Sequence, residues 1–336
     1  MLLATANKCP ESPARPVPAI ALAAALLAGL SGNAATQEWK PTEPVELIAT
    51  NAPGGGSDRI LRLFVKILGK YVTTPVTVVN RPGGGGAMAY NYVNQHAGSG
   101  HHLALASRSI LTNNIVGHGP SYATLTPVVH TFTEYISVNV KPVSPIQNAK
   151  QLVDFMKRDP SVISFGIATS VGGLNHQGAA VAFKVAGVDL RKMKNVIFPS
   201  GGAAVTALLG GHIDVVPISA AFGASLLRNK QIRMLAVTAP QRMPGVLADV
   251  PTWKELGFDA EVETYRYFTG PKSMTPAQIA FWEKTVALAT RDEAWKKELA
   301  ENFWQHKIMG SAELSSFLAR DYQVQKDFLT GIGLAK

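Results

Sequence analysis

Short apolar runs alternate with amphipathic runs along most of the chain. The first unit shows the pattern clearly: residues 44–50 predict a strand, 51–57 a glycine-rich turn, and the chain from Asp58 a helix. Along that helix, apolar side chains recur at helical spacing and basic side chains occupy the opposite face. We expect Ser57 or Asp58 to be its N-cap, because both side chains accept hydrogen bonds from a first helical turn.

The same type of unit recurs along the chain. Further strands are predicted at 76–79, 102–106, 162–167, 195–198 and 234–237, and helices at 87–95, 148–158, 175–186, 203–209, 276–289, 293–302 and 313–329. Strands that alternate with helices predict an α/β fold with mostly parallel sheets.

Extended runs in the middle of the chain predict crossings between two lobes. Residues 128–132, 135–140 and 261–268 have this character, and a chain of this length is enough for two sheets. We therefore expect a cleft between two lobes, each a mostly parallel sheet flanked by helices. The expected boundaries are 36–135 plus 258–336 for lobe 1 and 136–257 for lobe 2.

The N-terminus has the layout of a secretory signal peptide. Lys8 and Arg15 precede an apolar run at 19–30, and the small residues that follow suit cleavage after Ala34 or Ala35. Residues 1–35 are thus predicted to be removed on export. Cys9, the only cysteine of the chain, would leave with them. An exported chain without cysteine is typical of the bacterial periplasm.

Composition and charge exclude several classes of protein. Of the 336 residues, 46% are hydrophobic and 16% charged, which is a globular balance and not a disordered one. The net charge of +9 favours anionic partners, but the basic residues are scattered and form no nucleic-acid motif. Neither the dinucleotide G-x-G-x-x-G pattern nor the P-loop pattern is present, and the histidines lack metal-site spacing. We expect no cofactor and no metal.

Four glycine-rich turns, at 51–57, 80–86, 169–173 and 199–202, share one design. Each follows a strand and precedes a helix, so backbone N–H groups are presented at the positive end of a helix. Hydroxyl groups in three of these turns add hydrogen-bond donors. Ligands of such sheets bind at the carboxyl ends of the strands, where these turns lie. The pattern favours a cleft that binds an anion such as a carboxylate or phosphate.

An enzyme is the weaker hypothesis. Residues 168–172 loosely resemble a nucleophile elbow around Ser170, but alanine replaces the first glycine. The acid and the histidine that such a hydrolase needs do not follow Ser170 in a convincing order.

A family resemblance rests on a series of motifs in order. They are 53–59 (Pro-Gly-Gly-Gly-Ser-Asp-Arg), 79–86, 126–127, 164–166, 172–176, 200–203, 208–214, 233–242 and 249–257. Together they resemble the substrate-binding proteins of tripartite tricarboxylate transporters, the Bug/TctC family, and most closely its TctC-like branch.

This resemblance implies a two-lobed Venus-flytrap binding protein without catalytic activity. It implies that the ligand is a small organic acid with one or more carboxylates, and that a large and a small integral membrane subunit receive it. For this chain we expect a di- or tricarboxylate with an aliphatic or aromatic body. We expect a monomer. In the family, turns matching 53–58 and 200–203 hold a ligand carboxylate, and the turn matching 169–176 faces them. The candidate ligand-binding residues are Gly54, Gly55, Gly56, Ser57, Asp58, Thr169, Ser170, Gly172, His176, Ser200, Gly201, Gly202, Ala203 and Tyr265.

Departures from the TctC-like pattern bear on the ligand. Asn175 stands where the branch often has Asp, and the run 264–267 departs from a common Asn-Trp-Arg-Gly string although Arg266 matches. These changes argue against citrate itself. Tyr265 and Tyr267 either pack the crossing or line the cleft, and the second case would favour a ring or an apolar body. For Arg108, a solvated loop side chain is the favoured interpretation, and an anion contact is the alternative.

Two rival functions remain open from the sequence. The same flytrap could present its ligand to a membrane sensor in signalling, which neighbouring genes would distinguish from transport. An exported hydrolase would instead lose product formation when Ser170 is replaced by Ala.

Overall fold

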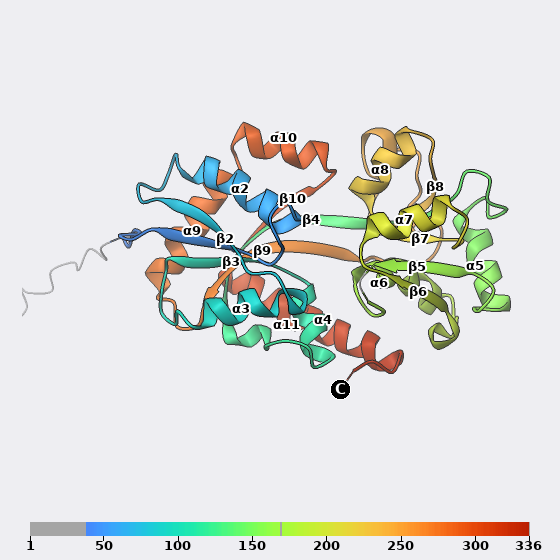
Figure 1. Ribbon diagram of the computed structural model, residues 1–336, viewed down its shortest axis with the longest axis horizontal. Coiled ribbons are helices and arrows are strands. Elements are labelled where there is room, and N and C mark those ends of the chain that lie inside the picture. The colour runs from blue at the N-terminus through green and yellow to red at the C-terminus, as the bar shows by residue number, and fades with distance from the viewer. Residues whose placement is uncertain (1–37, 169, 336) are drawn as a thin grey trace, which may run out of the picture. The chain divides into compact units, whose positions relative to one another are not determined.

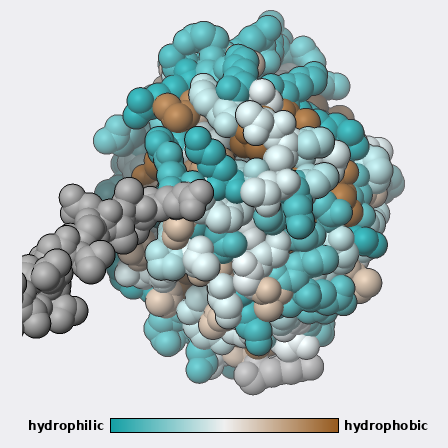
Figure 2. Space-filling model, turned by 90° about the vertical axis from the view of Figure 1, so that its left-hand side faces the viewer, coloured by the Kyte–Doolittle hydropathy of each residue, from teal (hydrophilic) through white to brown (hydrophobic). Residues whose placement is uncertain are grey.

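The computed structural model describes residues 38–168 and 170–335. The predicted signal peptide at 1–35 and the candidate residue Thr169 lie outside the described residues. Among the helices of the described ranges, none is long and apolar enough to cross a membrane. On the face of the molecule shown in Figure 2, hydrophobic residues are scattered singly over a mostly hydrophilic surface.

The fold has two lobes, which we name by their strands. The first lobe is built on β1, β2 and β3, and the second on β5, β6, β7 and β8 (Figure 1). The bounds of the strands are β1 Val45–Ala49, β2 Val76–Asn80, β3 His102–Ser107, β4 Leu125–Val140, β5 Ser164–Ala168, β6 Lys194–Phe198, β7 Val216–Ser219, β8 Arg233–Val237, β9 Glu263–Pro271 and β10 Gln305–Gly310.

The helices lie mainly where the periodicity predicts them. Their bounds are α2 Gly56–Leu68, α3 Ala87–Asn94, α4 Ser109–Ile115, α5 Ala149–Arg158, α6 Leu174–Val185, α7 Gly201–Leu209, α8 Ala220–Arg228, α9 Pro276–Ala289, α10 Glu293–Glu301 and α11 Ser311–Gly331. The predicted N-cap of α2 is wrong. Gly55 is the N-cap, and Ser57 and Asp58 lie inside the first turn, because their side chains bind Asn51 and the Gly54 N–H of the preceding loop instead.

The sheet of the first lobe is buried on both faces. Its strand order is β10-β4-β9-β3-β1-β2. Successive residues of β1 enter different cores: Leu47 packs with α2, α9 and α10, whereas Ile48 packs with α3, α4 and α11. Burial on both faces explains why three consecutive residues of β1, 47–49, are apolar.

The second lobe also has two apolar cores. One gathers α5, α6 and β5 around Phe165, Phe183 and Trp253. The other lies among α7, α8, β7 and β8. The last turn of α11 joins the first of these cores, because Phe328 and Leu329 are buried there.

Two long strands run from one lobe to the other (Figure 1). Up to Tyr135, β4 pairs with β9 and β10, and from Ile136 onward it pairs with β7 and β8. The extended runs predicted at 128–132 and 135–140 lie in β4, and most of the run predicted at 261–268 lies in β9.

The α/β class is confirmed, but the large sheet is mixed and not mostly parallel. The pairs β1–β2, β1–β3 and β5–β6 are parallel, as strand–helix–strand units require, whereas every pair that includes β4 or β9 is antiparallel. Periodicity within a strand carries no information on its partner's direction, so the sequence could not show this.

Candidate ligand-binding cleft

A cavity of about 950 Å³ lies where residues of both lobes meet. On the first lobe it is lined by the segments that follow the carboxyl ends of β1, β2 and β3, and on the second by the turn that follows β5. Binding at the carboxyl ends of strands is the rule for α/β sheets. The volume is within the range of small-molecule sites.

The turn after β1 is held by reciprocal hydrogen bonds. The backbone N–H of Ser57 donates to Asn51 Oδ1 at 3.1 Å, and the Asn51 N–H donates to Ser57 Oγ at 3.2 Å. Thr50, Asn51, Ala52 and Ser57 line the cavity. The turn therefore presents hydroxyl and amide groups to a ligand at the amino end of α2.

Asp58 supports this turn from behind. Its carboxylate accepts from the Gly54 N–H, from Asn80 Nδ2 and from Arg62 Nε, each at 2.9 Å. The bond from Arg62 outweighs burial and lowers the pKa of Asp58 to about 2. Asp58 is buried and does not line the cavity, so its role in the structure is to fix the loop.

The turn after β2 lines the cavity with the backbone of four glycines. Gly83, Gly84, Gly85 and Gly86 all have positive φ and all line the cavity. A Cβ on Gly85 would lie 2.1 Å from Asn113 Nδ2, which donates to the Gly85 carbonyl. Only glycine therefore fits at position 85, where the backbone lies directly against the Asn113 side chain.

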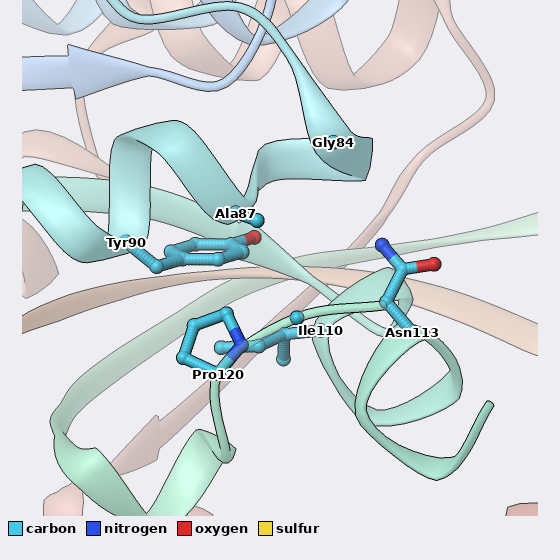
Figure 3. Close-up of a pocket in the computed structure, with 7 residues that line it drawn as sticks. Gly84, Ala87, Tyr90, Ile110, Asn113 and Pro120 are labelled. Atoms are coloured by element: carbon cyan, nitrogen blue, oxygen red, sulfur yellow. The ribbon is translucent and has the colours of Figure 1, made fainter. Parts of the chain in front are cut away.

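A small pocket adjoins this turn (Figure 3). Tyr90 lines it, with its ring between Ala87 and Ile110. Burial raises the pKa of Tyr90 to about 12. The phenol is thus a neutral packing group that supports the 83–86 turn.

Arg108 lines the cavity and is buried, so its interpretation as a solvated loop side chain is wrong. It follows β3, and its guanidinium forms a fork with Asp321 of α11, with Nε–Oδ2 at 3.1 Å and Nη2–Oδ1 at 3.0 Å. Its Nη1 donates to Gln177 Oε1 of α6 at 3.4 Å, which joins the first lobe to the second.

Asp321 is ionised in this network. Burial alone would raise the pKa of Asp321, but the charge of Arg108 and hydrogen bonds from Arg108, Tyr265 and Gln325 hold it below its ordinary value. Tyr265 Oη donates at 2.6 Å and Gln325 Nε2 at 2.9 Å. Arg108 is accordingly a fixed cation whose charge a carboxylate already balances.

Arg266 of β9 is the second arginine in the lining. Its Nη2 lies 3.2 Å from Glu134 Oε1, and its Nη1 donates to Thr264 Oγ1 at 3.2 Å. Glu134 in turn accepts from Ser219 Oγ at 3.4 Å, at the start of α8. This pair lies on the two strands that join the lobes.

On the second lobe, Ser170, Gly172 and Asn175 line the cavity around the amino end of α6. Asn175 Nδ2 is already engaged with the Pro217 carbonyl at 2.8 Å. His176 is buried behind the turn, where its Nδ1 accepts from the Gly172 N–H at 3.2 Å. Burial lowers the pKa of His176 to about 4, so the ring is neutral and can accept this bond.

The structure thus places part of the predicted site residues at the cavity. Ser57, Ser170 and Gly172 line it. The residues that do not are Gly54, Gly55, Gly56, Asp58, His176, Ser200, Gly201, Gly202, Ala203 and Tyr265. Ser200 caps α7 by accepting from the Ala203 N–H at 3.2 Å. Tyr265 and Tyr267 are both buried, and Phe222 is exposed on α8.

Sequence reasoning missed several lining residues. The segment 107–113 includes Ser107, Ser109 and Thr112, and α4, which begins in it at Ser109, is not predicted. A polar run directly after a buried strand was the available signal. Leu329 and Leu334, near the end of the chain, carried no signal, because only the fold brings them to the cavity.

A two-lobed α/β fold with a ligand-sized cavity between its lobes defines the class of solute-binding proteins. Residues 60–334 match the tripartite tricarboxylate transporter family receptor, TctC, and the chain belongs to this family. It is therefore a periplasmic receptor that binds a solute for a tripartite transporter, and not an enzyme.

Individual relatives and solved structures are similar to this chain over most of its length. A Cupriavidus necator protein named "UPF0065 protein in gbd 5'region" is 24% identical over 320 residues, 95% of this chain and 96% of its own. A TctC solute-binding protein from Polaromonas, solved without ligand, is 24% identical, with a TM-score of 0.74 over 86% of this chain and 99% of its own. An R. palustris protein solved with adipate is 21% identical, with a TM-score of 0.75 over 88% and 99%.

Proposed function

We propose that the cleft captures a small organic carboxylate and delivers it to the large and small integral membrane subunits of a tripartite transporter. The protein acts as a monomer, and a signal peptide at 1–35 directs its export. The observation that carries the proposal is the composition of the lining: hydroxyls, amides, glycine backbone and two arginines. In the described ranges, no Asp or Glu side chain belongs to this lining.

The physical chemistry of this lining suits a carboxylate. The amino ends of α2 and α6 reach the cavity near Ser57 and Leu174, and such ends stabilise negative charge. Charge-assisted hydrogen bonds from N–H and O–H groups orient a carboxylate without a free cation. The adipate of the R. palustris neighbour is a ligand of this chemical class.

We infer that ligand binding closes the lobes about β4 and β9, with lobe 1 at 36–135 plus 258–336 and lobe 2 at 136–257. The pairing of β4 supports the first boundary, because its partners change between Tyr135 and Ile136. Hinged closure on a ligand is common to two-lobed binding proteins.

The test is a thermal-unfolding screen of the exported chain, purified under denaturing conditions and refolded to remove bound ligand. Aliphatic and aromatic mono-, di- and tricarboxylates are compared with sugars and amines of similar size. An acid at 100 times its Kd should stabilise the fold by about 2.7 kcal/mol. Stabilisation by no carboxylate, or by sugars alone, would contradict the proposal.

A further inference from the structure

The C-terminal end of the chain forms part of the cleft wall. α11 begins in the first lobe, where Leu314 and Leu318 are buried near Tyr265, and its last turn enters a core of the second lobe. Beyond the helix the chain folds back, since the Leu334 N–H donates to the Leu329 carbonyl at 2.8 Å. This bend keeps both leucines together, and both line the cavity.

These leucines pack directly on the turn of the second lobe that faces the ligand. A Cβ on Gly172 would lie 2.6 Å from Leu329 Cδ2 and 3.0 Å from Leu334 Cδ1. Val171 and Leu174 from the same turn also line the cavity. The lining is thus apolar around Gly172, and we name Val171, Leu174, Leu329 and Leu334 the leucine wall.

The charges in the rest of the lining are already balanced. Arg108 is paired with Asp321 at 3.0 Å, and Arg266 with Glu134 at 3.2 Å. Within residues 38–168 and 170–335, the lining contains no lysine and no other arginine. Each additional ligand charge that is buried without a counter-charge is costly, so the cleft has little capacity for a trianion.

We propose that this cleft selects a carboxylate of low charge with an apolar body, and that the leucine wall recognises that body. The proposal rests on the carboxylate capture proposed above and narrows its substrate class. One end of such an acid is held by the polar turns and Arg108, while its carbon chain or ring contacts Leu334, which packs beside the buried Leu329. The C-terminal bend is thus a specificity determinant.

Matched acids test the charge preference. Hexanoate, adipate and tricarballylate all contain six carbons and carry one, two and three carboxylates; benzoate, phthalate and trimellitate form an aromatic counterpart. Calorimetric titration of the ligand-free, exported chain should give a mono- or dicarboxylate at least tenfold tighter binding than the tricarboxylate of its series. A tricarboxylate that binds equally well or better would overturn the proposal.

A substitution in the bend tests the wall. Leu334→Asn should weaken the tightest acid roughly fivefold or more, because an apolar contact is lost. Ile332→Asn is the matched control: Ile332 packs on the same core from the same bend but does not line the cavity, so the affinity of this variant should change less than twofold. Leu334→Met keeps an apolar side chain at this position, so this variant should bind the same acid with most of the wild-type affinity.

The outcomes separate this proposal from the one on which it rests. If Leu334→Asn and Ile332→Asn weaken binding equally, or neither does, the leucine wall has no role in specificity although carboxylate capture stands. If no carboxylate binds the wild-type chain, carboxylate capture itself fails and this proposal fails with it.

Discussion

At the scale of single residues, the cleft depends on buried polar groups that hold one another. Arg108 is the clearest case. It lines the cavity, and its guanidinium donates two hydrogen bonds to the carboxylate of Asp321, which balances its charge. Tyr265 and Gln325 complete the shell around the same carboxylate. Removing one partner of such a pair leaves an uncompensated charge in a dry site, which is far more costly than neutralising both.

Arg108→Met should accordingly lower the free energy of unfolding by about 3–5 kcal/mol. The double variant Arg108→Met with Asp321→Asn should recover most of this loss, because the amide still offers an acceptor to Tyr265 and carries no charge. Urea unfolding measures both, and calorimetry should show that the stable double variant still binds carboxylates more weakly than wild type. Recovery of stability together with full affinity would show that Arg108 only supports the fold.

Two buried histidines make stability depend on pH. Burial lowers the pKa of His130 and of His176 to about 4, whereas an unfolded histidine titrates near 6.5. Between these values the unfolded chain binds more protons than the folded one, so stability is complete above about pH 6.5 and falls as the pH decreases toward 4. Each histidine contributes a slope of at most about 1.4 kcal/mol per pH unit.

Urea unfolding at several values between pH 7.5 and 5 tests this dependence. His176→Asn should reduce the slope, and His212→Asn, at an exposed position, should leave it unchanged. Equal slopes in wild type and His176→Asn would contradict the assignment.

At the scale of elements, the turn before α6 is fixed by backbone geometry and by the C-terminal bend together. Gly172 has φ +82° and is covered by Leu329 and Leu334. Gly187, at the other end of α6, has φ +83°, and a Cβ on it would meet no heavy atom within 4 Å. The two glycines thus share a backbone conformation and differ in the space around them.

Gly172→Ala should therefore be more destabilising than Gly187→Ala. The left-handed backbone costs both variants about 1–2 kcal/mol, but only Gly172→Ala also displaces the leucine wall and weakens ligand binding. Thermal unfolding and calorimetry of the two variants provide the comparison. If Gly172→Ala and Gly187→Ala lose equal stability and keep the wild-type affinity, Leu329 and Leu334 can move aside without changing the cleft.

At the scale of the whole molecule, three segments join the lobes within the part of the chain that the structure describes. β4 and β9 cross side by side, and α11 starts in the first lobe and ends in a core of the second. The Arg108–Gln177 contact adds a polar link between the lobes beside the cavity. Movement of the lobes must bend the two strands and shift the end of α11, which couples the leucine wall to closure.

Binding of the acid identified in the thermal screen should reduce the radius of gyration measured by small-angle X-ray scattering. A carboxylate that failed to stabilise the protein in that screen is the control and should cause no change. Tight binding without compaction would mean that the cleft captures its ligand without closure about β4 and β9.

From the amino-acid sequence one can predict the α/β class, the place of most helices and strands, and the glycine-rich turns that line the cleft. These features are local, because apolar periodicity and turn chemistry act over a few residues. The motifs around 53–59 and 172–176 also indicated the family. The antiparallel course of β4 and β9 was not readable, since pairing depends on partners more than 100 residues apart.

The character of the cavity depends on contacts that form only in the folded chain. Arg108 is a buried, balanced cation because Asp321, 213 positions further along the chain, lies against it. Ser200 points to its own helix and Tyr265 to Asp321, although both stood out in the sequence. Leu334 reaches the cleft only because α11 crosses between the lobes. A side chain's environment is set by contacts distant in sequence, and those contacts give the cleft its charge balance and its apolar wall.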